Sequence, residues 1–122
     1  MRLYLDTNVI VDLFDNRDSA SYDLFLRSLR CQHTLVISSW AIGELERIGY
    51  GLQADTLLKL LMYSKKVVFV RHSRSDNIAD RSIPTDYADA VHYAIFSRSA
   101  EKFVTKNIRH FPFPNVGTPA DF

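Results

Sequence analysis

Cysteine is almost absent from this chain of 122 residues, which contains only Cys31. A lone cysteine excludes an intrachain disulfide and a zinc site built from several cysteines. No apolar run approaches the ~20 residues that a helix needs to cross a bilayer, and the N-terminus shows no basic segment followed by a cleavable apolar one. These absences predict a cytoplasmic protein with no membrane association.

An excess of one charge sign is missing as well. Lys and Arg together number 15 and Asp and Glu 14, which gives a formal net charge of +1. Such a balance produces no strong global field toward nucleic acid, so a surface that binds a polyanion would have to be a local patch. The length is typical of one domain, and we expect residues 1–122 to form a single domain.

Short apolar runs alternate with segments of helical periodicity along the chain. The runs predict strands at residues 2–5, 34–37, 66–70 and 102–105, with a short edge strand near Val116 also open. The intervening segments predict helices, including one over residues 40–50 that Ser38 and Ser39 cap and Gly51 ends. Its expected buried residues are Ala41, Leu45 and Ile48. The alternation predicts an α/β domain with a parallel sheet and right-handed crossovers.

Two further segments admit two interpretations each. Residues 52–63 carry leucines on more than one helical face, which suits a helix packed on its own sheet alone or on a partner subunit as well. Residues 71–82 bring together four basic side chains, namely Arg71, His72, Arg74 and Arg81. They could present charge to a phosphate backbone, although a solvated helix or loop also explains them.

Acidic residues follow the first two predicted strands. Asp6 comes directly after the first strand, and in open parallel sheets ligands bind at the carboxyl ends of the strands. Asp6 also suits the N-cap of the next helix, and one side chain can fill both roles. Glu44 is expected in the second turn of the helix after the second strand, off its buried stripe and close to the same edge of the sheet.

The second half of the chain supplies two more candidates. Asp86 and Asp89 are three residues apart on one predicted helix, where like charges repel unless a cation or the helix N-terminus compensates. The first helical turn explains Asp86 but not Asp89. Asn107 follows the fourth strand in the position that Asp6 occupies after the first. We therefore expect Asp6, Glu44, Asp89 and Asn107 at one edge of the sheet.

Three carboxylates in one pocket would repel strongly, so this arrangement requires a bound cation. Oxygen ligands without cysteine favour Mg²⁺ or Mn²⁺ over zinc. Such an ion activates water and offsets charge on a scissile phosphate. The sequence therefore favours metal-assisted hydrolysis of a phosphodiester bond.

Four motifs carry a resemblance to the PIN-domain family and, within it, to VapC-type toxin ribonucleases. They are LDTNVI at residues 5–10, ISSWAIGEL at 37–45, DAVHYA at 89–94 and VTKNIRHF at 104–111. The motifs occur in order and span nearly the whole chain. The resemblance implies a PIN-like three-layer α/β/α fold with a central parallel sheet of about four to five strands.

The resemblance also implies an activity and its residues. It implies a Mg²⁺- or Mn²⁺-dependent endoribonuclease that acts on RNA, as the toxin of a type II toxin–antitoxin pair, with a cognate antitoxin and a homodimer as partners. Asp6, Glu44 and Asp89 would bind metal, and Asn107 would orient metal or water. The pocket would be lined by Thr7, Asn8 and Thr105. Many relatives carry a fourth acid near Asn107 or just before Phe111, where this chain has Asn107 and His110.

Two other functions remain open at the level of sequence. One is a phosphohydrolase resembling the haloacid dehalogenase family, with Asp6 as nucleophile, Ser38 ending the second strand and Lys106 neutralising phosphate. That family expects an acid two residues after the nucleophile, where this chain has Asn8, and it gives Glu44 no role. The other is a PIN-like module that binds RNA or a partner without cleaving.

Overall fold

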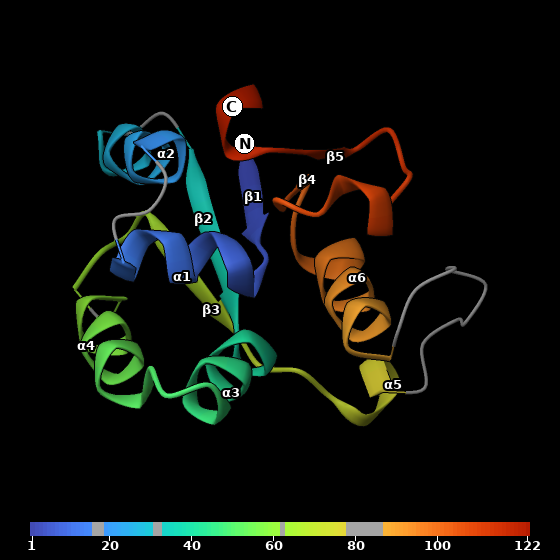
Figure 1. The fold of residues 1–122 in the computed structure, drawn as a ribbon, viewed down its shortest axis with the longest axis horizontal. Helices are drawn as coiled ribbons and strands as arrows, with labels where there is room; N and C mark the ends of the chain where they lie inside the picture. Colours follow the sequence, from blue (N-terminus) through green and yellow to red (C-terminus); the bar gives the residue numbers. More distant parts are fainter. Residues whose placement is uncertain (16–18, 31–32, 62, 78–86) are drawn as a thin grey trace.

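The computed structural model of the protein describes residues 1–15, 19–30, 33–61, 63–77 and 87–122 (Figure 1). Five strands form one parallel sheet in the order β3-β2-β1-β4-β5. The strands are β1 (Arg2–Leu5), β2 (Thr34–Ser38), β3 (Val67–Val70), β4 (Lys102–Val104) and β5 (Val116–Gly117). The predicted parallel sheet is confirmed, including the short edge strand near Val116.

Helices cover both faces of this sheet. They are α1 (Thr7–Asp15), α2 (Ser19–Leu29), α3 (Ser39–Arg47), α4 (Gly51–Leu61), α5 (Arg74–Asn77) and α6 (Tyr87–Ser99), and two 3₁₀ turns follow at Ile108–His110 and Pro119–Asp121. Helices α1 to α4 lie on one side of the sheet and α6 on the other (Figure 1). The predicted three-layer α/β/α fold is therefore confirmed.

Alternating side chains of β1 divide the interior into two cores. Leu3 and Leu5 point to one face, where they pack with the apolar residues of α1 to α4. Tyr4 points to the opposite face, where it packs with α6 and with the aromatic residues Phe103 and Phe111. Both faces of a central parallel strand are buried, which is why β1 is apolar throughout instead of alternating with polar residues.

The end of α3 differs from the prediction. Ser38 caps the helix as expected, and its side chain accepts a hydrogen bond from the Ala41 amide. The helix then stops at Arg47, so Ile48 is 57% exposed and is not part of the predicted buried stripe. Gly49 makes the turn with φ of 96°, a conformation that costs glycine little. Gly51 begins α4 instead of ending α3.

Other predictions fall partly outside the described residues. Asp86 and Arg81 lie there, so their predicted roles stay predictions. Within the described part of the basic segment, Arg74 begins the short helix α5 and is exposed. No helix in the described ranges is long and apolar enough to cross a membrane.

The register of the sheet places three strand ends side by side. Leu5 at the end of β1 pairs with Val104 of β4, and the Asp6 amide donates to the Val104 carbonyl at 2.9 Å. Strand β2 lies on the other side of β1 and ends at Ser38. Residues that follow β1, β2 and β4 therefore meet at one edge of the sheet.

Candidate active site

Asp6 is held in place by three neighbours at the end of β1. Its Oδ1 accepts the Thr7 amide at 2.7 Å, and its Oδ2 accepts the Thr105 hydroxyl at 2.8 Å and the Asn8 amide at 3.3 Å. The side chain is almost fully buried. The three polar side chains predicted to line this site, those of Thr7, Asn8 and Thr105, all lie next to Asp6.

Burial makes the charged form of Asp6 costly. Desolvation raises the pKa of this carboxyl above its ordinary value, and the neighbouring Asp89 adds to that increase. The opposing contributions come from His92 and from the hydrogen bonds of Thr105 and Thr7, and they are smaller in total. The site therefore favours a positive charge next to Asp6.

Glu44 lies on α3 beside Asp6 and is connected to it through other side chains. The Thr7 hydroxyl donates to Glu44 Oε1 at 2.7 Å, and His92 Nε2 contacts the same oxygen in a short hydrogen bond. Burial raises the pKa of Glu44, but the hydrogen bond and the charge of His92 outweigh this effect, so the pKa is lowered. Glu44 is thus charged and oriented without any added ligand.

His92 contacts two of the predicted site residues, Asp6 and Glu44, but was not itself predicted as a site residue. Its imidazole is buried on α6, with Nε2 also 3.6 Å from Asp6 Oδ1 and Nδ1 2.6 Å from the Tyr4 hydroxyl. Burial lowers the pKa of His92, but Glu44, Asp6 and Asp89 together raise it above the ordinary value. The available signal was its position three residues after Asp89, which places both on one helical face.

Basic side chains line the outer part of the site, where the sequence lacks a fourth acid. His110 Nδ1 lies 3.0 Å from Asp89 Oδ2, and Lys106 Nζ forms an ion pair with Asp12 Oδ2 at 2.7 Å. Asn107 is exposed, and its backbone amide donates to the Thr105 hydroxyl at 3.0 Å. Asp12 is almost fully buried and was not predicted as a site residue.

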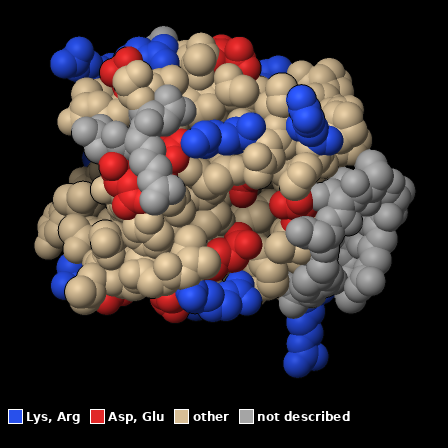
Figure 2. Space-filling view, viewed as in Figure 1, with Lys and Arg blue, Asp and Glu red and all other residues tan. Residues whose placement is uncertain are grey.

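These residues surround an open pocket of about 400 Å³. It is lined by Asp6, Thr7, Asn8, Val11, Asp12, Ile48, Asp89, Lys106 and Asn107. Figure 2 shows Asp and Glu side chains around a hollow in the middle of this face, with Lys and Arg side chains on either side. The structure thus brings Asp6, Asp89 and Asn107 to one pocket, and Glu44, which accepts a hydrogen bond from Thr7 of that pocket, is not among the lining residues.

Solved structures with a similar fold come from toxin–antitoxin systems. VapBC2 from Rickettsia felis, solved with a DNA fragment from its promoter, is 19% identical with a TM-score of 0.69, and the match covers 97% of this chain and 98% of that one. A toxin–antitoxin complex from Klebsiella pneumoniae is 18% identical with a TM-score of 0.70, covering 96% and 97%. No family model and no curated protein matches the sequence.

A third similar structure is VapC20 from Mycobacterium tuberculosis, described as a toxin that cleaves the sarcin–ricin loop. It is 14% identical with a TM-score of 0.60, and the match covers 93% of this chain and 98% of that one. The chain has the PIN-like fold of VapC toxins. The PIN-like fold extends over nearly the full length of each compared chain, as the four sequence motifs predicted.

The acids of this PIN-like fold do not form a closed metal cage. In the described ranges, no three His, Cys, Asp or Glu side chains converge tightly enough to hold a metal ion by themselves. The carboxylates that line the pocket are those of Asp6, Asp12 and Asp89, and Asp12 is paired with Lys106. Glu44 Oε1 is already engaged by Thr7 and His92. The arrangement therefore suits a ligand that brings some of its own coordinating atoms.

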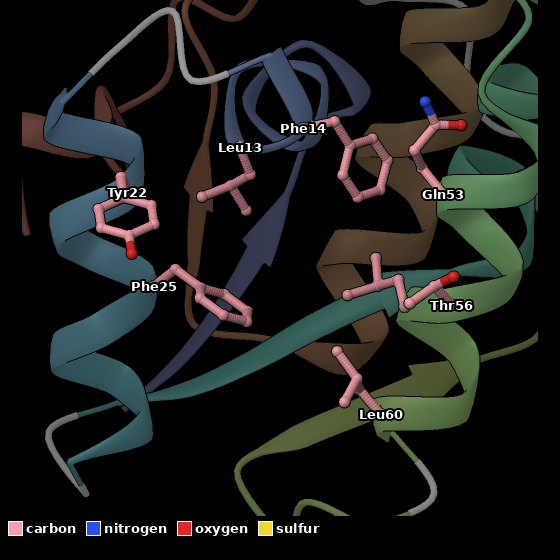
Figure 3. Close-up of a pocket in the computed structure, with 8 residues that line it drawn as sticks. Leu13, Phe14, Tyr22, Phe25, Gln53, Thr56 and Leu60 are labelled. Carbon is pink, nitrogen blue, oxygen red and sulfur yellow. The ribbon is translucent and has the colours of Figure 1, made fainter.

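A second pocket, of about 280 Å³, lies away from these acids between α1, α2 and α4 (Figure 3). Its lining is almost entirely apolar and consists of Leu13, Phe14, Tyr22, Phe25, Gln53, Thr56, Leu57 and Leu60. Leu60 is 57% exposed, so α4 does present apolar residues on a face that its own sheet does not bury. Whether that face meets a partner, as in the second interpretation of residues 52–63, stays a prediction.

Proposed function

We propose that the protein is a Mg²⁺- or Mn²⁺-dependent endoribonuclease that serves as the toxin of a toxin–antitoxin pair. The observation that carries this proposal is that Asp6 and Asp89 line an open pocket and that Glu44 is hydrogen-bonded to Thr7 of the same pocket. The fold supports it, because a similar structure is described as a toxin that cleaves the sarcin–ricin loop.

The donor set of the pocket fits a hard divalent cation. Mg²⁺ commonly retains several waters and binds through one or two carboxylates together with substrate phosphates, so it needs no complete protein cage. Asp6 has about four acceptor directions, of which Thr7, Thr105 and Asn8 use three. Asp6 and Asp89 would hold the ion, and Glu44 would hold one of its waters.

The ion, when bound, supplies an activated water and offsets charge on the scissile phosphate. The protein's own residues supply position and charge around it. Lys106 lines the pocket with its ammonium group fixed by Asp12, so it can contact a phosphate beside the acids. Asn107 lies at the same opening and would orient water or the substrate through its amide.

The dehalogenase-like alternative fits the structure less well. It requires Ser38 to face a phosphate, but the Ser38 hydroxyl is buried and bonded to Tyr4 at 2.8 Å and to the Ala41 amide at 3.1 Å. It also expects an acid two residues after Asp6, where this chain has Asn8, and it gives Glu44 no role. The non-cleaving module remains the alternative that experiment must separate from a nuclease.

The decisive experiment incubates the purified protein with structured and single-stranded RNA, with Mg²⁺ or Mn²⁺ or with EDTA. We expect cleavage only with metal, and a loss of about 100-fold or more for Asp6→Asn, since it removes a proposed metal ligand. Asp55→Asn, an exposed acid on α4, is the matched control and should cleave like the unmodified protein. Cleavage in EDTA would exclude the metal mechanism, and binding of RNA without cleavage would favour the module.

The toxin role includes an inhibitory protein partner. Two similar structures are toxin–antitoxin assemblies, and the apolar pocket between α1, α2 and α4 offers a surface for apolar side chains of such a partner. Leu60→Asp should then lower the affinity for the product of an adjacent small gene and leave RNA cleavage unchanged. Cytoplasmic location and a homodimer stay predictions.

A further inference from the structure

A buried chain of side chains connects the sheet interior to Glu44. It begins at Ser38, whose hydroxyl lies 2.8 Å from the Tyr4 hydroxyl, and continues from Tyr4 to His92 Nδ1 at 2.6 Å. On the far side of the ring, His92 Nε2 contacts Glu44 Oε1. Tyr4 and Ser38 are both fully buried, so water does not compete for these hydrogen bonds.

The donors and acceptors available determine which atom donates in each of these hydrogen bonds. A neutral imidazole has one donor and one acceptor nitrogen, and the imidazolium ion has two donors. Glu44 is an acceptor and Tyr4 can donate or accept, so Nε2 carries the proton toward Glu44 in both cases. The Tyr4 hydroxyl adapts by donating either to Nδ1 or to Ser38. The donor at Nε2 is therefore independent of the protonation state of the ring.

The same ring is also fixed by packing. Tyr4 makes an edge contact with the imidazole, with ring centroids 5.7 Å apart. Tyr4 itself packs against Phe96 and Phe103 in the core beneath α6. Glu44 is only half-buried, so without this contact its side chain would sample several rotamers, because a Glu side chain has substantial conformational entropy.

We propose that His92 is a positioning residue that fixes the Glu44 carboxylate at the proposed metal site, with the Tyr4 hydroxyl setting the orientation of the imidazole. This proposal rests on the proposed function, because the effect expected when His92 is changed is a loss of metal affinity. Side chains that orient the groups around a metal site by hydrogen bonds change metal affinity by about 10–100-fold when they are removed. The hydrogen-bonded side chains of Ser38, Tyr4 and His92 orient Glu44 in this way.

Two substitutions of His92 separate positioning from packing. In His92→Gln the side-chain amide can take the place of Nε2 and still donate to Glu44, whereas in His92→Asn it takes the place of Nδ1 and does not reach Glu44. We expect Mn²⁺ affinity, measured by calorimetry, to fall by about 10-fold or more in His92→Asn and by less than about 3-fold in His92→Gln. Equal losses of Mn²⁺ affinity in the two variants, each matched by an equal fall in melting temperature, would overturn the proposal.

Tyr4→Phe tests the second half of the chain with a nearly isosteric change. It should weaken Mn²⁺ binding by an amount between those of the two His92 variants, because the imidazole loses its fixed partner. The control is Tyr93→Phe, which removes a hydroxyl from the residue that follows His92 on α6. Within the described residues this hydroxyl makes no hydrogen bond, so the substitution should leave Mn²⁺ affinity unchanged. An equal effect of both substitutions would count against the role of Tyr4.

A measurement on the metal-free protein keeps this proposal separate from the nuclease proposal. The proton on His92 Nε2 should give a slowly exchanging downfield resonance that is lost in Glu44→Ala and retained in Glu46→Ala, which changes an exposed acid on the same helix. Its persistence in Glu44→Ala would overturn the positioning role. Absence of Mn²⁺ binding, with the resonance behaving as expected, would overturn the proposed metal site and leave the contact established.

Discussion

Asp6 and Asp76 are both buried aspartates, 6% and 3% exposed, but their pKa values are shifted in opposite directions. Asp76 in α5 accepts two hydrogen bonds from Arg98, at 3.0 and 2.7 Å, and one from the Ser73 amide at 2.7 Å. The bonds from Arg98 outweigh burial and lower the pKa of Asp76, whereas burial raises the pKa of Asp6.

The difference separates an acid that stabilises the fold from an acid available to a ligand. Arg98 is a permanent cation, and its forked geometry satisfies the Asp76 carboxylate and joins α6 to α5. The positive charge that lowers the pKa of Asp6 comes from His92, and the carboxylates of Asp12 and Asp89 line the same pocket, where Lys106 is paired with Asp12. A buried acid left without a full counter-charge beside an open pocket is a marker of a functional site.

The largest expected effect concerns divalent metal and stability. A ligand that binds only the folded state stabilises it by about 2.7 kcal/mol at a free concentration of 100 times its Kd. Mn²⁺ at that level should therefore raise the melting temperature of the unmodified protein and of Asp76→Asn, but not that of Asp6→Asn. Scanning fluorimetry with and without EDTA measures this, and an equal shift in Asp6→Asn would remove the distinction between the two acids.

The next effect is on the stability of the metal-free fold. Asp76→Asn should lower the free energy of unfolding by about 1–2 kcal/mol, because it weakens a charge-assisted pair whose guanidinium is partly exposed. Asp6→Asn should leave the free energy of unfolding unchanged or raise it, because it removes a buried charge. Urea unfolding of both variants in EDTA tests this, with Asp55→Asn as the surface control. A larger loss for Asp6→Asn would contradict it.

The smallest effect is the pH dependence of these differences. The folded-state pKa of Asp6 is raised, so its contribution is present below the unfolded value of 3.8 and is lost as pH rises through the folded pKa. As pH rises across that window, the free energy of unfolding of Asp6→Asn should therefore increase relative to that of the unmodified protein. The pKa of Asp76 is lowered, so its contribution is present above 3.8 and is lost as pH falls through the folded pKa.

Urea unfolding in EDTA from about pH 3 to about pH 7 measures both differences on either side of the ordinary aspartate pKa. The difference between Asp76→Asn and the unmodified protein should shrink toward the acid end. The difference between Asp6→Asn and the unmodified protein should grow toward the neutral end. Slopes of the same sign for the two variants would show that burial does not dominate the environment of Asp6.

Local sequence signals were sufficient for the layers of the fold and for the positions of the acids along it. Asp6 follows an apolar run and Ser38 caps the next helix, and both signals depend on a few adjacent residues. The end of α3 was mispredicted because Gly49 and Gly51 are both plausible breaks, and only packing decides which one turns. Ile48 then falls outside the helix and is exposed.

The sequence by itself determined that carboxylates would follow strands at one edge of a parallel sheet, because strand ends and helix starts are local features. The tertiary structure alone decided what surrounds each carboxylate. Tyr4 and His92 are 88 residues apart and meet only when α6 packs on β1. Lys106 reaches Asp12 and His110 reaches Asp89 across the same edge. Burial and long-range partners set the charge balance of the site, and neither can be read from neighbouring residues.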